Sequence, residues 1–125
     1  ATRFIATKEC DASQAYKQMM VDAHKEDIAI VKSPVGFPGR ALKTKLIKRI
    51  ESGRIVPEFC LNCLTPCRAA DTPYCITQAL ISAVEGNAES GLFFCGAGVW
   101  KIRDITTVKA IMDECVGEAE KIMEG

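Results

Sequence analysis

The chain has 125 residues, 48% of them hydrophobic and 26% charged, and its sixteen Lys and Arg residues balance sixteen Asp and Glu residues. This composition is that of one ordinary globular domain and argues against a disordered chain. Because the net charge is zero, no field concentrates polyanions, so nucleic acid is not an expected partner. No apolar run is long enough to span a bilayer and no leader is recognisable, so we expect no membrane insertion and a cytoplasmic location.

The amino-terminal third predicts two short strands and a helix. Residues 1–7 are apolar and β-branched, which indicates a strand, and residues 28–31 form a second short apolar run bounded by polar and turn residues. Between them, Asp11 or Ser13 is a suitable cap for a helix over 13–23. The apolar positions of this helix fall on one face, as expected for packing on a sheet or barrel: Tyr16, Met19, Met20 and Ala23.

The middle of the chain predicts a turn and two helices. Prolines and glycines over 34–39 predict a tight loop, and a helix is expected from Arg40 to Ile50, ending at Ser52-Gly53. A further helix is expected to start at Thr72-Pro73, with Thr as cap and Pro in the first turn, and to end at Gly86-Asn87.

The last third predicts a close approach of backbone and a long helix. The run 91–98 is apolar and ends in glycines, a composition typical of backbone that lies near a ligand or another chain, or of a buried strand and turn. Asp104 or Thr106 is expected to cap the terminal helix, whose apolar stripe must dock on an apolar surface. The whole segment is therefore expected to be mainly helical, with two or three short strands.

Four of the seven cysteines, Cys60, Cys63, Cys67 and Cys75, fall within sixteen positions. Such spacing suits a tetrahedral structural zinc site or an iron–sulfur cluster, because short intervals let the sulfurs converge. Buried or paired cysteines are the alternative interpretation. The other three, Cys10, Cys95 and Cys115, lie in apolar patterns and are expected to behave as small core residues.

Three stretches together resemble one family. Ala1-Thr2-Arg3-Phe4 with the residues that follow, the segment 79–87, and Gly91-Leu92 with Cys95-Gly96-Ala97-Gly98 are similar to the flavin-dependent nitronate monooxygenases, also called 2-nitropropane dioxygenases. The related FMN-containing enoyl-acyl-carrier-protein reductases of the second type share this pattern. The resemblance covers essentially the whole chain. It departs at Ala1, where a glycine is usual, and at Ala97, where many members carry Gln.

The resemblance implies an α/β fold in which this chain is the carboxy-terminal segment of an FMN-binding TIM barrel. The FMN phosphate would lie near Thr2 and Arg3, in keeping with the phosphate sites after the last barrel strands, and Gly96, Ala97 and Gly98 would cover the flavin ring. The family's catalytic histidine has no counterpart here, and His24 is expected to be a surface residue. We therefore expect no catalytic residue in this chain and no activity from the chain alone.

The partners implied are the upstream barrel portion and, in the whole enzyme, NAD(P)H or a nitronate-type substrate. Apolar faces suited to a barrel also predict self-association of an isolated chain, so a homo-oligomer is a further expectation. A second class of function stays open at this point: a small cysteine-ligated metal-binding interaction domain without catalysis. Flavin absorbance and metal analysis distinguish the two.

Overall fold

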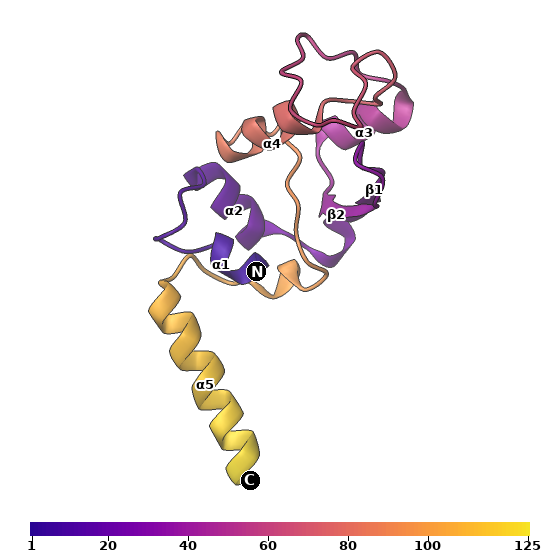
Figure 1. Cartoon of the computed structure of the whole chain (residues 1–125). Coiled ribbons are helices and arrows are strands. Elements are labelled where there is room, and N and C mark those ends of the chain that lie inside the picture. Colours follow the sequence, from indigo (N-terminus) through magenta and orange to yellow (C-terminus); the bar gives the residue numbers. More distant parts are fainter.

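A computed structural model describes residues 1–125, and helices account for most of its regular structure (Figure 1). Two short 3₁₀ turns and one two-stranded sheet complete it, so the prediction of a mainly helical chain with a few short strands is confirmed. In chain order the elements are α1 (Thr2–Ile5), α2 (Gln14–Asp22), η1 (Lys25–Asp27), β1 (Ile28–Val31), β2 (Gly39–Leu42), α3 (Lys45–Ser52), α4 (Ile76–Val84), η2 (Val99–Lys101) and α5 (Val108–Glu124).

The predicted strand over residues 1–7 is wrong: most of this segment is the short helix α1. The amide of Phe4 donates to the carbonyl of Ala1, and the hydroxyl of Thr7 donates to the carbonyl of Phe4 at 2.7 Å. Only Thr7 is paired as in a sheet, through one parallel bridge to Thr106. A strand needs a partner along its length, and the rest of the chain provides one only at this position.

Helix α2 and strand β1 confirm the sequence predictions closely. Ser13 caps α2, its side-chain oxygen accepting a hydrogen bond from the amide of Tyr16 at 3.2 Å. Strand β1 has the predicted bounds and pairs antiparallel with β2, with Ile28 opposite Leu42 and Val31 opposite Gly39.

The helix predicted from Arg40 begins later, because the first three residues of that segment belong to β2. Strand β2 is hydrogen-bonded on both sides. One edge pairs with β1, and along the other the carbonyl of Arg40 accepts from the amide of Cys95 while the amide of Leu42 donates to the carbonyl of Phe93. This pairing with a distant segment overrides the local helical periodicity. Helix α3 then ends at Ser52, followed by Gly53 as predicted.

Helix α4 also begins later than predicted, with Cys75 rather than Thr72 at its cap position. The Thr72 hydroxyl donates to the carbonyl of Tyr74 at 2.8 Å, and the carbonyl of Pro73 accepts from the amide of Ile55 at 2.8 Å. These bonds hold both residues in the preceding loop. The predicted end is confirmed, since Gly86 follows the helix with a left-handed φ of 86°.

Two hydrophobic clusters form the core, and they meet at the segment after α4. Adjacent side chains of an extended segment point to opposite sides. Phe93 and Leu42 therefore pack in one cluster, and their neighbours Leu92 and Ala41 pack in the other. Leu92 and Phe93 are fully buried. This alternation places the glycine-containing loop that follows, 96–98, at the edge of the core.

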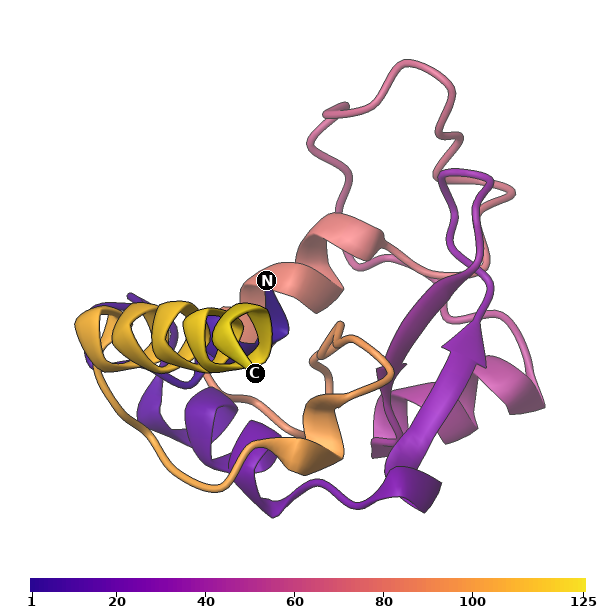
Figure 2. The same ribbon diagram turned by 90° about the horizontal axis from the view of Figure 1, so that it is seen from below.

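Helix α5 projects away from the rest of the molecule (Figure 1), and in the view from below it lies in front of the other elements (Figure 2). Thr107 caps it, its side chain accepting from the amide of Ala110, in place of the predicted Asp104 or Thr106. Of the predicted apolar stripe only Ile111 is buried, whereas Met112 is 50% exposed and Ile122 is 80% exposed. The chain therefore covers only the first turns of this helix. None of the helices has the length and apolarity needed to traverse a membrane.

Candidate functional site

The structure brings together two of the stretches that the sequence placed at a flavin site. Thr2 and Gly96 lie 94 positions apart, yet the Gly96 amide donates a 2.7 Å hydrogen bond to the Thr2 hydroxyl oxygen. A Cβ at position 96 would lie 3.0 Å from that oxygen, closer than ordinary contact. Glycine at this position therefore allows the amino terminus and the 96–98 loop to meet.

The loop 96–98 presents its backbone to solvent. Gly96 is half-buried, and Ala97 and Gly98 are exposed. The carbonyls of Gly96 and Gly98 accept hydrogen bonds from Val99 and Lys101, but the amides of Ala97 and Gly98 donate to no protein acceptor. Exposed amides of this kind are suited to bind the oxygens of an anionic or polar ligand. Space above Gly98 is open, since a Cβ at that position would have only the Lys101 side chain within 4.0 Å.

Arg3 is anchored within the protein rather than free. Its guanidinium forms an ion pair with the Asp104 carboxylate at 2.7 Å and also donates to the carbonyls of Asp104 and Ala6. The Arg3 side chain keeps 29% of its surface exposed. The positive charge expected to meet a phosphate follows Thr2 in the chain, but it is already shared with the Asp104 carboxylate.

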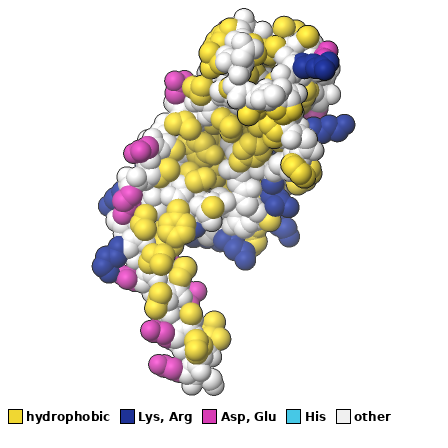
Figure 3. Space-filling view, viewed as in Figure 1, with side chains coloured by type: hydrophobic (Ala, Val, Ile, Leu, Met, Phe, Trp, Pro, Cys, Tyr) yellow, Lys and Arg dark blue, Asp and Glu magenta, His cyan; other side chains and the backbone are white.

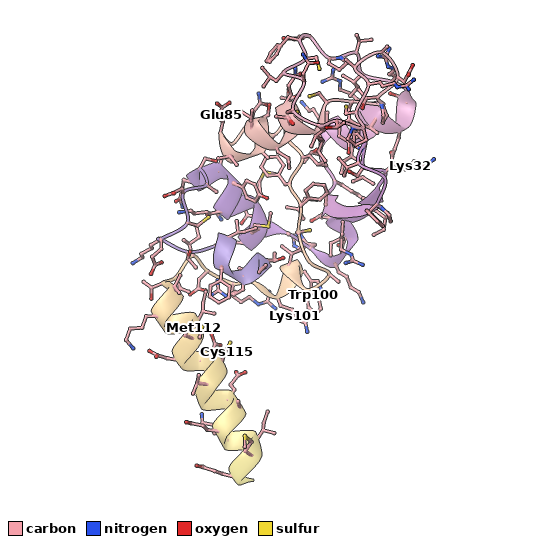
Figure 4. The ribbon with its side chains drawn as sticks, viewed as in Figure 1. Lys32, Glu85, Trp100, Lys101, Met112 and Cys115 are labelled. Carbon is pink, nitrogen blue, oxygen red and sulfur yellow. The ribbon has the colours of Figure 1, made fainter.

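Lys101 is a cation next to the loop that sequence reasoning did not single out. Its ammonium lies 5.5 Å from the centre of the Trp100 ring, a cation–π contact, and both residues lie at the same end of the molecule (Figure 4). The sequence feature that could have identified Lys101 as a candidate ligand-binding residue is its position directly after the glycine-containing loop. Lys101 is exposed and has no carboxylate partner within salt-bridge distance.

Tyr16 packs in the core, and Cys95 packs against it just before the 96–98 loop. Burial, with smaller contributions from neighbouring Cys95 and Cys10, raises the pKa of Tyr16 to about 12. The Tyr16 hydroxyl donates to the carbonyl of Phe94 at 3.3 Å, and its ring meets Phe93 edge to face. Burial also raises the pKa of Cys95, although Arg40 opposes this. Both groups are therefore neutral at physiological pH and act as packing residues.

The four clustered cysteines line one hollow of about 190 Å³ at the opposite end of the molecule. None forms a disulfide, and no group of three or more His, Cys, Asp or Glu side chains lies close enough to hold a metal ion. Of the three cysteines expected to be core residues, Cys10 and Cys95 are half-buried, but Cys115 is exposed on α5, so that prediction is wrong for Cys115. His24 is exposed and lies 3.3 Å from Asp27.

Comparison with known proteins shows the family. The sequence profile of nitronate monooxygenase matches residues 1–118, nearly the whole chain. The chain therefore belongs to the nitronate monooxygenase family, whose members are oxidoreductases, and the resemblance predicted from sequence is confirmed. Since the match includes the cysteine-rich loop, the alternative of an independent metal-binding interaction domain is not supported.

Two solved structures are similar to this chain. FabK from Thermotoga maritima is 28% identical with a TM-score of 0.75, and the match covers 99% of this chain and 37% of FabK. A point mutant of the same FabK is 26% identical with a TM-score of 0.72, covering 99% of this chain and 33% of the mutant. The chain thus spans about a third of the length of these structures. A search of curated proteins found no match.

Proposed function

We propose that this chain forms the carboxy-terminal part of an FMN-dependent oxidoreductase, acting either on nitronates or as an NAD(P)H-dependent enoyl reductase. The observation that supports this proposal most directly is the Thr2–Gly96 hydrogen bond, because it joins the two stretches that the family resemblance places at the flavin. When bound, FMN would supply the redox chemistry, accepting a hydride from NAD(P)H or electrons from a nitronate.

The residues of this chain would bind and orient the cofactor. The exposed amides of Ala97 and Gly98 are available as donors, and the absence of a side chain at Gly98 leaves room for a flat ring to approach. Arg3, whose side chain is partly exposed, and Lys101, which lies beside Gly98, each provide a positive charge of the kind that binds phosphate. The residues present therefore fit an FMN site that further parts of the protein would complete.

Substrate chemistry would depend on residues outside this chain. A TIM barrel has about 250 residues, so an upstream portion would contribute most of the flavin pocket and any catalytic base. We assign no catalytic residue here, and we propose that the chain alone does not turn over nitronates or oxidise NADH or NADPH. The cytoplasmic location and any homo-oligomer likewise remain predictions from the sequence.

The apolar surface of the chain supports this proposal. Hydrophobic side chains gather on the face shown in Figure 3, over α4 and the loop before it, and continue along α5. Several are large and at least half exposed: Val56, Phe59, Leu61, Val84, Met112, Val116, Ile122 and Met123. Contiguous apolar surface of this kind marks an interaction site, and a barrel portion of the same polypeptide is the occupant we propose.

A Thr2→Val substitution in the full-length protein tests the flavin assignment. Valine has nearly the same shape but offers no acceptor, so the Gly96 amide loses its partner and the 96–98 loop loses its anchor. A buried unpaired amide costs about 1–3 kcal/mol, and we expect FMN affinity to fall by roughly tenfold. The measurement is titration of the apoprotein with FMN, followed by flavin fluorescence. Thr65→Val, on the exposed cysteine-rich loop, is the matched control and should leave affinity unchanged.

Two results would contradict the proposal. If Thr2→Val binds FMN as tightly as the parent while its stability falls, the hydrogen bond is only structural. If the 125-residue chain alone holds one equivalent of FMN and shows steady-state turnover, the site is complete without further parts and the proposed division of the enzyme is wrong.

A further inference from the structure

The segment between α3 and α4, residues 53–75, contains no helix or strand. Loops of this length without secondary structure are uncommon in compact domains unless they are functional. Its base is closed by hydrogen bonds: the Arg54 guanidinium donates to the carbonyls of Thr72 at 2.9 Å and Ala69 at 2.7 Å, and the Ile55 amide donates to the carbonyl of Pro73. The loop therefore returns to its starting point at a defined position.

Four free thiols border a single hollow inside this loop. Cys60, Cys63, Cys67 and Cys75 all line it, and its volume is about 190 Å³. About 10–15 Å³ of such volume is enough to hold one water molecule, so the hollow leaves room for the side chains to turn inward. None of the other three cysteines lines this hollow, so the grouping is specific to the loop.

Hydrogen-bonding groups already lie next to two of these sulfurs, Cys60 and Cys63. Asn62 has a left-handed φ of 50°, which turns the chain between Cys60 and Cys63, and its amide donates to the Cys60 sulfur at 3.4 Å. The Thr77 hydroxyl lies 3.1 Å from the Cys63 sulfur, and either group can be the donor of this hydrogen bond. The Cys60 thiol in turn donates to the side-chain oxygen of Asn62 at 3.7 Å. Donors directed at sulfur stabilise a thiolate, and outer hydrogen bonds of this kind orient metal ligands.

We infer that Cys60, Cys63, Cys67 and Cys75 bind one zinc ion, a structural site separate from the proposed flavin site. Four thiolates at about 2.3 Å in a tetrahedron are an established ligand set for structural zinc. In the structure the sulfurs are not gathered, because no three of them lie close enough to hold one ion. Binding therefore requires the loop to close around the hollow.

Binding is a ligand exchange without oxidation. Four S–H bonds break heterolytically, four Zn–S bonds form, and the protons pass to solvent, so uptake of the ion is favoured as pH rises. The resulting site has a net charge of −2. The loop itself contributes no net charge, because Arg54 and Arg68 are balanced by Glu58 and Asp71.

The surroundings of the loop suit closure. Phe59 and Leu61 are 57% and 61% exposed, so tighter packing of the loop would remove apolar surface from water. Gln78 on α4 already holds the loop through a 2.7 Å bond to the carbonyl of Phe59. Because Cys75 is also the cap residue of α4, zinc at this site would order the start of that helix.

Metal titration of the reduced, chelator-treated full-length protein tests the inference. We expect one equivalent of Zn²⁺ to bind with release of protons, and Co²⁺, used as a probe, to show the visible absorption of tetrahedral thiolate coordination. Cys63→Ser should weaken Zn²⁺ binding by on the order of a hundredfold, since even outer-shell changes cost roughly 10–100-fold. Cys115→Ser, which alters an equally exposed cysteine on α5, is the control and should bind as the parent does.

Three outcomes would overturn the inference: binding of less than about a tenth of an equivalent by the parent protein, a Co²⁺ spectrum without tetrahedral thiolate character, or unchanged affinity in Cys63→Ser. Iron with inorganic sulfide on the same thiols would overturn the assignment to zinc. Because the parent protein is titrated directly, a variant that fails to fold does not prevent a decision. FMN content, measured in parallel, distinguishes failure of this site from failure of the proposed function.

Discussion

Replacing Gly91 with alanine is expected to destabilise the fold. Gly91 is buried between the end of α4 and the segment that leads to the 96–98 loop. A Cβ there would lie 2.6 Å from the carbonyl oxygen of Asn87, 2.6 Å from the Phe93 ring and 2.9 Å from the Cα of Ala83. Two of these three atoms are backbone, so a rotamer change cannot relieve the clash.

The expected loss of unfolding free energy depends on how easily the segment around Gly91 can shift to accommodate a Cβ atom. Phe93 is fully buried, and the Gly91 carbonyl accepts from the Thr44 hydroxyl at 3.3 Å, so the segment is held on both sides. Overpacking of this kind costs about 1–3 kcal/mol, and we expect the upper end of that range. A native domain has a free energy of unfolding of only about 5–15 kcal/mol, so the loss is readily measured.

Equilibrium urea unfolding, followed by the fluorescence of Trp100, the single tryptophan, provides the assay. Gly117→Ala is the control, because a Cβ at that position meets nothing within 4 Å and alanine favours the helix by up to about 1 kcal/mol. We expect a lower midpoint for Gly91→Ala with an unchanged slope, and an equal or higher midpoint for Gly117→Ala. A loss below about 0.5 kcal/mol for Gly91→Ala would refute the close approach of α4 and the following segment.

Three further predictions concern single groups. The pKa of Tyr16 is raised to about 12 from 10.0, so the stability that its neutral hydroxyl contributes is complete below pH 10.0 and is lost as pH rises toward about 12. Tyr16→Phe should therefore reduce the loss of unfolding free energy at alkaline pH by roughly 2–3 kcal/mol. Urea titrations across this pH range measure that loss. Thr107→Ala removes the cap of α5 and should cost about 1 kcal/mol locally, seen as faster amide exchange in the first turn of α5 while α2 is unaffected. Asp104→Asn should change thermal stability by less than about 1 kcal/mol, because the Arg3–Asp104 pair is largely solvent-exposed and Arg3 keeps its bonds to backbone carbonyls; a larger loss would show that the pair is a main support of the amino terminus.

Local patterns in the sequence determined much of this protein. The cap at Ser13, the strand 28–31, the end of α3 at Gly53 and the end of α4 at Gly86 all follow from neighbouring residues, because capping and turn conformations depend on interactions a few positions apart. The ordered motifs along the chain also indicated the family, which the profile match over residues 1–118 confirmed.

Tertiary structure decided what depends on distant partners. The segment at Arg40 is a strand because β1 and the 93–95 segment pair with it. Residues 1–7 form no strand, because only Thr7 finds a sheet partner. The bond between Thr2 and Gly96 and the pairing of Arg3 with Asp104 likewise join residues whose relation no local pattern specifies. Helix α5 shows the same dependence: its periodicity predicted an apolar stripe, but burial requires a surface to receive it, and the chain provides one only around Ile111.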